Sequence, residues 1–152
     1  MSLKFRRAEA HDLPEIIRLL SDDALGQHRE DFQLPLPQAY IKAFQKIDAD
    51  PSQELIAVTN GAGDLVGTMQ LSYIQYLTYQ GGVRAQIEAV RIRREDRGKG
   101  FGRLMFEWAI KRSKQKGAHV VQLTTDKKRP EALKFYESLG FMPTHEGMKL
   151  HI

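Results

Sequence analysis

The stretch RGKGFG at residues 97–102 decides the fold, because a strand pattern precedes it and a helix pattern follows it. Residues 83–92 have the pattern of a strand, and residues 101–117 then repeat apolar side chains at helical spacing. Glycines at such a junction let backbone N–H groups converge, and the start of a helix adds a partial positive charge. The stretch therefore predicts an anion-binding loop between a strand and a helix.

Two better-known glycine loops do not fit this spacing. The dinucleotide pattern GxGxxG needs glycine where the chain has Arg103 or Met105. The Walker pattern needs Ser or Thr after Gly-Lys, but Lys99 is followed by Gly100. What remains is Arg97-x-x-Gly100-x-Gly102, which by itself says only that an anion binds there.

The rest of the chain alternates strand and helix patterns around this loop. Strands are predicted at residues 3–7, 54–59, 65–77, 83–92 and 119–125, with short ones around Phe141 and at 148–152. Helices are predicted after Asp12, at 38–47, after the loop and after Pro130, with a polar loop at 26–37. The order predicts a single α/β (α+β) domain over residues 1–152, with a mixed sheet of six to seven strands flanked by about four helices.

Composition narrows the possible classes of protein. The 152 residues include no cysteine, which excludes disulfides, cysteine-ligated zinc and a thiol nucleophile, and makes a cytoplasmic location the expectation. No signal peptide or membrane-spanning run is evident, and the histidines show no metal-ligand spacing, so we expect no metal and no membrane. The net charge of +4 suits a polyanionic partner without choosing between nucleic acid, an anionic cofactor and none.

The loop resembles the Gln/Arg-x-x-Gly-x-Gly/Ala signature of the GNAT superfamily of N-acetyltransferases. Residues 87–92 (IEAVRI) resemble the fourth strand of that family, and residues 132–141 (ALKFYESLGF) resemble its block A-x-x-x-Y-x-x-x-G-F. The element order also matches from Leu3 onward, although residues 87–141 are the specific part. The resemblance implies an acetyltransferase fold with acetyl-CoA as co-substrate.

By this resemblance, backbone N–H groups of the loop hold the CoA pyrophosphate, and the backbone at 90–92 pairs with the pantetheine arm and polarises the thioester carbonyl. The implied acetyl-CoA residues are Val90, Arg91, Ile92, Arg97, Gly98, Lys99, Gly100, Phe101, Gly102, Arg103 and Arg129. Arg129 departs from the family, which commonly has Asn seven residues before the Tyr. The basic turn at 126–129 could reach a CoA phosphate or an anionic substrate, or be a solvated helix entry; Arg103 could likewise only face solvent.

Two residues are expected to move protons. An ammonium has no lone pair with which to attack a thioester, and the departing sulfur leaves more easily when protonated. The resemblance assigns the base to Glu88, usually through water, and the general acid to Tyr136. Alternatively, Glu88 pairs with a nearby arginine and Tyr136 is an amphipathic core residue. No covalent acyl-enzyme is indicated, so we expect direct attack in a ternary complex.

The acceptor is expected to be a primary amine of a small molecule. Tyr73 and Tyr76 are candidate pocket walls beside Glu88, although tyrosines on a strand are also common half-buried sheet residues. The chain is similar to small-molecule amine acetyltransferases, including the aminoalkylphosphonate N-acetyltransferases. Alternatives are a peptide or protein N-acetyltransferase and a non-catalytic CoA-binding regulatory domain. No nucleic-acid-binding pattern is present, and the chain is expected to be a monomer or homodimer.

Overall fold

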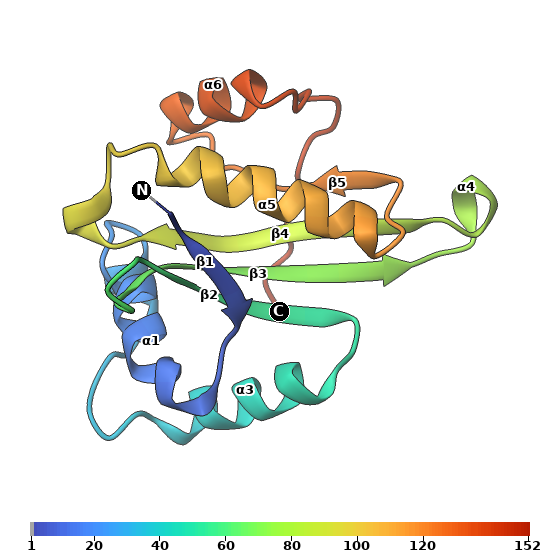
Figure 1. Cartoon of the computed structure of the whole chain (residues 1–152). Helices are drawn as coiled ribbons and strands as arrows, with labels where there is room; N and C mark the ends of the chain where they lie inside the picture. Colours follow the sequence, from blue (N-terminus) through green and yellow to red (C-terminus); the bar gives the residue numbers. More distant parts are fainter. Residues whose placement is uncertain (1) are drawn as a thin grey trace.

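The computed structural model describes residues 2–152 and places one mixed sheet between helices (Figure 1). Its strand order is β1-β2-β3-β4-β5, antiparallel except for the parallel pair β4 and β5. The strands are β1 (Lys4–Arg7), β2 (Gln53–Thr59), β3 (Leu65–Gln75), β4 (Val83–Ile92) and β5 (Val120–Gln122). The predicted mixed α/β class is confirmed, with five strands in the part of the chain described.

The helices follow the predicted order. The longer ones are α1 (Leu13–Ser21), α3 (Gln38–Ala49), α5 (Phe101–Gln115) and α6 (Pro130–Ser138). Single turns form α2 (Gly26–Arg29), α4 (Thr78–Gly81) and the 3-10 turns Ala10–Asp12 and Arg94–Asp96. Helix α5 is the crossover between the parallel strands β4 and β5, as the period change after the loop predicts.

The two faces of the sheet are covered by different helices because side chains alternate along each strand. On β2, Ile56 and Val58 belong to a core shared with Met105 and Phe106 of α5. The intervening Ala57 belongs to a separate cluster with residues of α1. Helix α3 joins α1 in a third cluster through its buried Phe44. Two apolar layers, one on each face, thus hold the sheet.

The predicted strand number is wrong at the C-terminal end of the sheet. Residues 119–125 were expected to form one strand, but only Val120–Gln122 pairs with Arg84–Gln86 before β4 and β5 separate. The short strands expected around Phe141 and at 148–152 are irregular chain, and none of the described residues pairs with them. Their alternating pattern is suited to a strand, but a strand also needs a neighbour, which the sequence pattern does not reveal.

One buried ionic network joins β2, β3 and α5. Glu54 is only 3% exposed. It accepts hydrogen bonds from the Tyr73 hydroxyl at 2.6 Å and from Nε and Nη2 of Arg112 at 3.0 and 2.6 Å. Burial alone would raise the pKa of Glu54, but these hydrogen bonds outweigh it and hold the pKa below its usual value of 4.5.

We expect Glu54→Ala to lower the free energy of unfolding by about 3 kcal/mol at pH 7, because it leaves the buried Tyr73 hydroxyl and Arg112 without their acceptor. Since the folded pKa is the lower one, the difference from wild type is full above the usual 4.5 and shrinks as the pH falls below it. Urea denaturation at several pH values measures both. The control is Glu107→Ala, which removes an exposed ion pair with Arg103 on α5. It should lower the free energy of unfolding by less than about 0.5 kcal/mol.

Candidate functional site

The glycine loop adopts a backbone conformation that glycine takes without strain. Gly98 and Gly100 have φ of +76° and +82°, in the left-handed region where an L side chain is strained. Gly100 is the N-cap of α5, and no side chain caps the first N–H groups of that helix. A Cβ on either glycine would meet no atom within 4 Å, so the space above the loop is open. The exposed N–H groups of the helix start are therefore available to an anion.

The side chains around the loop mostly fix its shape. Phe101 is 3% exposed and anchors the start of α5 in the core. Nζ of Lys99 lies 2.9 Å from the buried Asp96, which also accepts a 2.6 Å hydrogen bond from Arg93. The hydrogen bond from Arg93, followed by that from Lys99, holds the pKa of Asp96 below its usual range. Arg103 donates to the Ser138 hydroxyl at 3.1 Å, which links α5 to α6.

Arg97 joins the loop to the strand before it and to the turn after α1. Its Nε donates to the carbonyl of Ile92 at 3.1 Å and its Nη2 to the carbonyl of Asp22 at 3.2 Å. Arg94 forms a 2.7 Å ion pair with the Asp22 carboxylate. A pocket of about 340 Å³ lies here, lined by Ser21, Asp22, Asp23, Ala24, Gln27, Arg94 and Arg97. The expected role of Arg97 toward a phosphate is thus combined with a structural one.

Strand β4 carries an irregularity immediately before the loop. Ala89 has φ of +54°, and the pairing with β3 shifts there from Gln70–Glu88 to Thr68–Arg91. The extra residue is a β-bulge, a device that re-aims a strand next to a site. Beyond Gln86, β4 has no strand partner on its β5 side among the described residues. The backbone at Val90 and Ile92 thus lies in the part of β4 that has separated from β5.

The α6 side of this opening is built from aromatic residues. The Tyr136 ring packs against Phe106, Phe135 and Phe141 at centroid distances of 5.4, 5.6 and 6.2 Å. Phe135 also comes close to the loop, since a Cβ on Gly102 would lie 3.5 Å from its ring and from Ile92. The Tyr136 block, the loop and the end of β4 are therefore neighbours, as the resemblance implies.

The Tyr136 hydroxyl makes no hydrogen bond with any of residues 2–152. Burial raises the pKa of Tyr136, and the positive charges of Arg129 and Arg91 only partly oppose this. The phenol therefore keeps its proton at neutral pH and is free to donate it. Arg129 is exposed at the entry to α6, close enough for its charge to act on both Tyr136 and Arg91.

The side chain of Arg91 is held by Asp23, a residue that the sequence did not predict for the site. Its Nε lies 2.7 Å from Asp23 Oδ2, and both side chains are largely buried. Asp23 Oδ1 also accepts the N–H groups of Gly26 and Leu25 at 2.5 and 3.1 Å. This pairing ties the turn between α1 and α2 to β4. The only local signal was an Asp-Asp pair after a helix, which does not identify a partner in a strand far along the chain.

Glu88 lies on the sheet face opposite α5, in a row of polar side chains. Gln86 donates a hydrogen bond to Glu88, and Gln122 donates to Gln86 at 2.8 Å. Gln70 pairs with Glu88 across β3 and β4. Glu88 is exposed and pairs with no arginine among the described residues. The amide residues were missed, although alternating polar residues at positions 84, 86 and 88 did indicate a polar face.

The two tyrosines proposed as pocket walls are not brought together. Tyr73 is buried on the α5 face of β3, and its hydroxyl is held by Glu54. Glu88 is on the other face of the sheet, so Tyr73 and Glu88 do not line the same side. Tyr76 lies beyond the end of β3, where Arg84 stacks over its ring at 4.3 Å and His119 hydrogen-bonds its hydroxyl.

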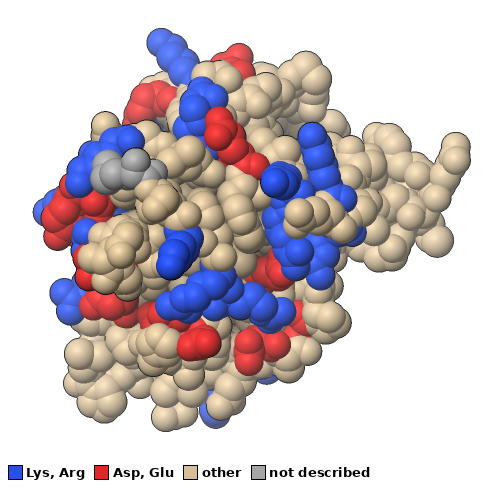
Figure 2. All heavy atoms as spheres, viewed as in Figure 1, with Lys and Arg blue, Asp and Glu red and all other residues tan. Residues whose placement is uncertain are grey.

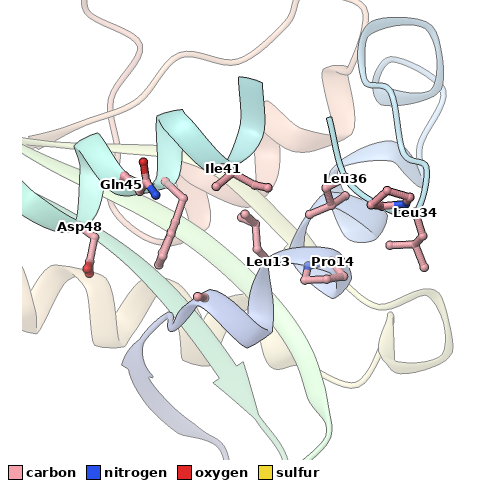
Figure 3. Close-up of a pocket in the computed structure, with 10 residues that line it drawn as sticks. Leu13, Pro14, Leu34, Leu36, Ile41, Gln45 and Asp48 are labelled. Atoms are coloured by element: carbon pink, nitrogen blue, oxygen red, sulfur yellow. The ribbon is translucent and has the colours of Figure 1, made fainter. Parts of the chain in front are cut away.

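Two other surface features lie away from the loop. An apolar pocket of about 560 Å³ opens between α1, α3 and the chain before α3, with Leu13, Leu36 and Ile41 among its lining residues (Figure 3). Figure 2 shows Lys and Arg side chains gathered over the C-terminal end of α5, which carries Lys111, Arg112 and Lys114 and is followed by Lys116. Cations are favourable at a helix C-terminus, so this patch is explained without a ligand.

Within residues 2–152, no group of three or more acidic or histidine side chains is arranged to hold a metal ion. No helix in the same range is both long and apolar enough to cross a membrane. The features that remain are an uncapped helix start, a glycine loop and a separated pair of parallel strands. Such features are typical of α/β domains that bind an anionic molecule at the carboxyl end of a strand.

Sequence comparison places this domain in a family. The profile of the acetyltransferase (GNAT) family matches residues 14–141, so the chain belongs to that family. It is an acetyl-CoA-dependent N-acetyltransferase. An L-methionine sulfoximine/L-methionine sulfone acetyltransferase from Pseudomonas aeruginosa is 27% identical over 93% of this chain and 81% of its own length. The aminoalkylphosphonate N-acetyltransferase of Salmonella typhimurium is 25% identical over 93% and 86%.

Solved structures share the whole fold. A crystal structure from Bacillus halodurans C-125, described as a transcriptional regulator, superposes with a TM-score of 0.95 at 47% identity, covering 99% of this chain and 100% of its own. A putative acetyltransferase from Agrobacterium tumefaciens gives a TM-score of 0.85 at 26% identity, covering 98% and 99%.

Proposed function

We propose that the enzyme transfers an acetyl group from acetyl-CoA to a primary amine of a small molecule, by direct attack in a ternary complex. The observation that carries this proposal is the Tyr136 hydroxyl, protonated and without a partner among the described residues, next to the open end of β4 and the glycine loop. Tyr73, the other tyrosine that packs in this core, instead donates its hydroxyl proton to the buried Glu54.

In this proposal acetyl-CoA binds as an extended molecule along β4. The N–H groups around Gly98, Gly100 and Gly102 donate hydrogen bonds to the pyrophosphate at the start of α5. The separated edge at Val90 to Ile92 pairs with the pantetheine arm, and Lys99, Arg103 and Arg129 add positive charge. The thioester then lies between the bulged part of β4 and Tyr136, where N–H groups polarise its carbonyl.

The reaction needs one base and one acid. Glu88, directly or through water, takes the proton of the ammonium group, and the freed nitrogen attacks the thioester carbon. The new C–N bond forms as the C–S bond breaks, and Tyr136 donates a proton to the departing sulfur. The products are the N-acetylated amine and CoA with a free thiol. The second proton of the amine returns to solvent, and from there the phenol recovers its own.

The relatives of this chain favour a small molecule over a peptide as the acceptor. Two relatives described above act on amino compounds that carry an oxidised sulfur or a phosphonate, in agreement with a small amine acceptor.

An amine panel tests this proposal. Thiol release from acetyl-CoA, with mass spectrometry of the products, should detect acetylation of small primary amines and amino acids. Acetylation confined to peptides would support a peptide acetyltransferase instead. Binding of acetyl-CoA without turnover of any amine would indicate a regulatory domain. Titration with duplex DNA should show no binding comparable to that of acetyl-CoA.

For Glu88→Gln we expect kcat/KM for the amine to fall about 10- to 100-fold at pH 7, because the ammonium loses its local base. The deficit should shrink toward pH 10, since solvent then supplies the neutral amine. The measurement is a pH–rate profile. Glu107→Gln, an exposed glutamate on α5, is the control. A Glu88→Gln profile that overlays wild type would remove the base from this residue.

A further inference from the structure

A series of hydrogen-bonded side chains crosses the sheet face opposite α5 and ends at Glu88. We call these four residues, Arg84, Gln122, Gln86 and Glu88, the amide network. Nη1 of Arg84 donates to Oε1 of Gln122 at 3.3 Å, and Nε2 of Gln122 donates to Oε1 of Gln86 at 2.8 Å. Nε2 of Gln86 then donates to Oε1 of Glu88. The network thus connects a guanidinium at one end with a carboxylate at the other.

The two ends give the amide network a single direction. An arginine side chain has N–H donors and no acceptor, so only the Oε1 atom of Gln122 can bind it. The NH₂ group of Gln122 is then turned toward Gln86, and the NH₂ group of Gln86 toward Glu88. An ionised carboxylate only accepts hydrogen bonds, so the other end requires the same order. Each amide therefore has its donor on the side of Glu88.

The arginine end of the network is held by a stacking contact. The guanidinium of Arg84 lies over the Tyr76 ring at 4.3 Å, and the Tyr76 hydroxyl is hydrogen-bonded to His119. Arg84 and the two glutamines are half-buried, whereas Glu88 is exposed. Because stacking and partial burial restrict the Arg84 side chain, it can orient the amides that follow it.

The network reaches Glu88 where β4 and β5 separate. Gln122 is the last residue of β5, and its pair with Gln86 is the last between these two strands. Figure 1 shows β4 continuing past the end of β5. Oε2 of Glu88 accepts no hydrogen bond from residues 2–152. One carboxylate oxygen is therefore held, and the other is free beside the opening between the strands.

We propose that Gln86 is a positioning residue for acetyl transfer: its amide holds one oxygen of Glu88 and leaves the other to take the proton of the amine. Gln122 and Arg84 determine which way this amide faces. Glutamate has a long and flexible side chain, and a base acts only within hydrogen-bond reach of the proton it takes. Fixing one oxygen restricts the positions of the other. This inference rests on the proposed role of Glu88 as the base and adds residues that act through it.

A double-mutant cycle of Gln86→Leu and Glu88→Gln tests the inference with an amine that the wild type acetylates. Gln86→Leu should lower kcat/KM for the amine about 5- to 10-fold at pH 7, less than the loss of the base itself, and leave the KM for acetyl-CoA within about twofold. The deficit should shrink toward pH 10, because solvent then supplies the neutral amine. In the Glu88→Gln background, Gln86→Leu should change kcat/KM by less than about twofold.

The outcomes of the cycle separate this inference from the proposed function. If Glu88→Gln leaves activity unchanged, Glu88 is not the base and both fail. If Glu88→Gln is slow but Gln86→Leu is as fast as wild type, only the positioning role is rejected. The positioning role is also rejected if the two losses multiply in the double variant. Gln86 would then contact the acceptor, and the KM for the amine should rise even without Glu88.

Gln122→Leu tests the direction of the network and leaves Gln86 and Glu88 in place. Without Gln122 the Gln86 amide can face either way, so kcat/KM should fall about two- to fivefold, and only when Glu88 is present. The control is Gln53→Leu, at a half-buried glutamine of β2 that accepts a 2.6 Å hydrogen bond from Gln70 outside the network. Thermal denaturation of each variant shows that it is folded. Equal losses of activity in Gln122→Leu and Gln53→Leu would overturn the role of Gln122.

Discussion

Tyr136→Phe should lower kcat for acetyl transfer by about 100-fold or more while the KM for acetyl-CoA changes less than threefold. General acid catalysis contributes on the order of 10²- to 10⁴-fold, and the substitution removes only the proton that the departing sulfur would receive. The ring stays in its cage of Phe106, Phe135 and Phe141, so the fold should be unaffected. Because the hydroxyl has no hydrogen-bond partner among the described residues, its removal should leave no other buried group unsatisfied.

Wild type and Tyr136→Phe are compared by steady-state kinetics, with an amine that the wild type acetylates, and by thermal denaturation. Tyr79→Phe is the matched control, because that ring is 76% exposed and lies on the hairpin after β3. Burial raises the pKa of Tyr136, so the alkaline loss of activity through loss of this proton should come at a higher pH than for an ordinary tyrosine. If Tyr136→Phe turns over at the wild-type rate, the sulfur is protonated by another group or by water.

The features of the site that depend only on neighbouring residues could be predicted from the sequence. The positive φ of Gly98 and Gly100 follows from the need to turn a strand directly into a helix, which glycine does without strain. The burial of Phe101 follows from its place on the apolar stripe of α5. The neighbourhood of Tyr136 and the loop came from the family resemblance. No spacing rule would have placed α6 beside the start of α5.

Features that depend on distant partners could not be predicted from the sequence. The pairing of Asp23 with Arg91 joins two elements far apart in the chain, and only the fold brings them together. Tyr73 was expected at the site because it and the neighbouring hairpin tyrosines have a spacing that could form the wall of a pocket. Alternation shows that a residue shares a face with its second neighbours, but not which helix covers that face. The same limit explains the missing sixth strand, since residues 148–152 have a strand pattern and no partner among the described residues.

The loop offers the second large effect: Gly100→Ala should raise the dissociation constant for acetyl-CoA about 30- to 100-fold. Gly100 has φ of +82°, where a Cβ costs about 1–2 kcal/mol, and the variant relieves this strain by moving out of the left-handed region. The N–H groups at the start of α5 would then diverge from one anion. The strain and one weakened charge-assisted hydrogen bond together reduce the binding free energy of acetyl-CoA by about 2–3 kcal/mol. A change of about 1.4 kcal/mol corresponds to a factor of ten in the dissociation constant.

Gly63→Ala separates this loss of binding from general destabilisation. Gly63 has φ of +88° in the turn between β2 and β3, and a Cβ there, as at Gly100, would meet nothing within 4 Å. Gly63→Ala therefore shows how far a Cβ at a similar positive φ lowers the melting temperature when it lies away from the loop. Isothermal titration should then show weak acetyl-CoA binding for Gly100→Ala and wild-type binding for Gly63→Ala. Equal affinities in the two variants would mean that the pyrophosphate does not bind at this helix start.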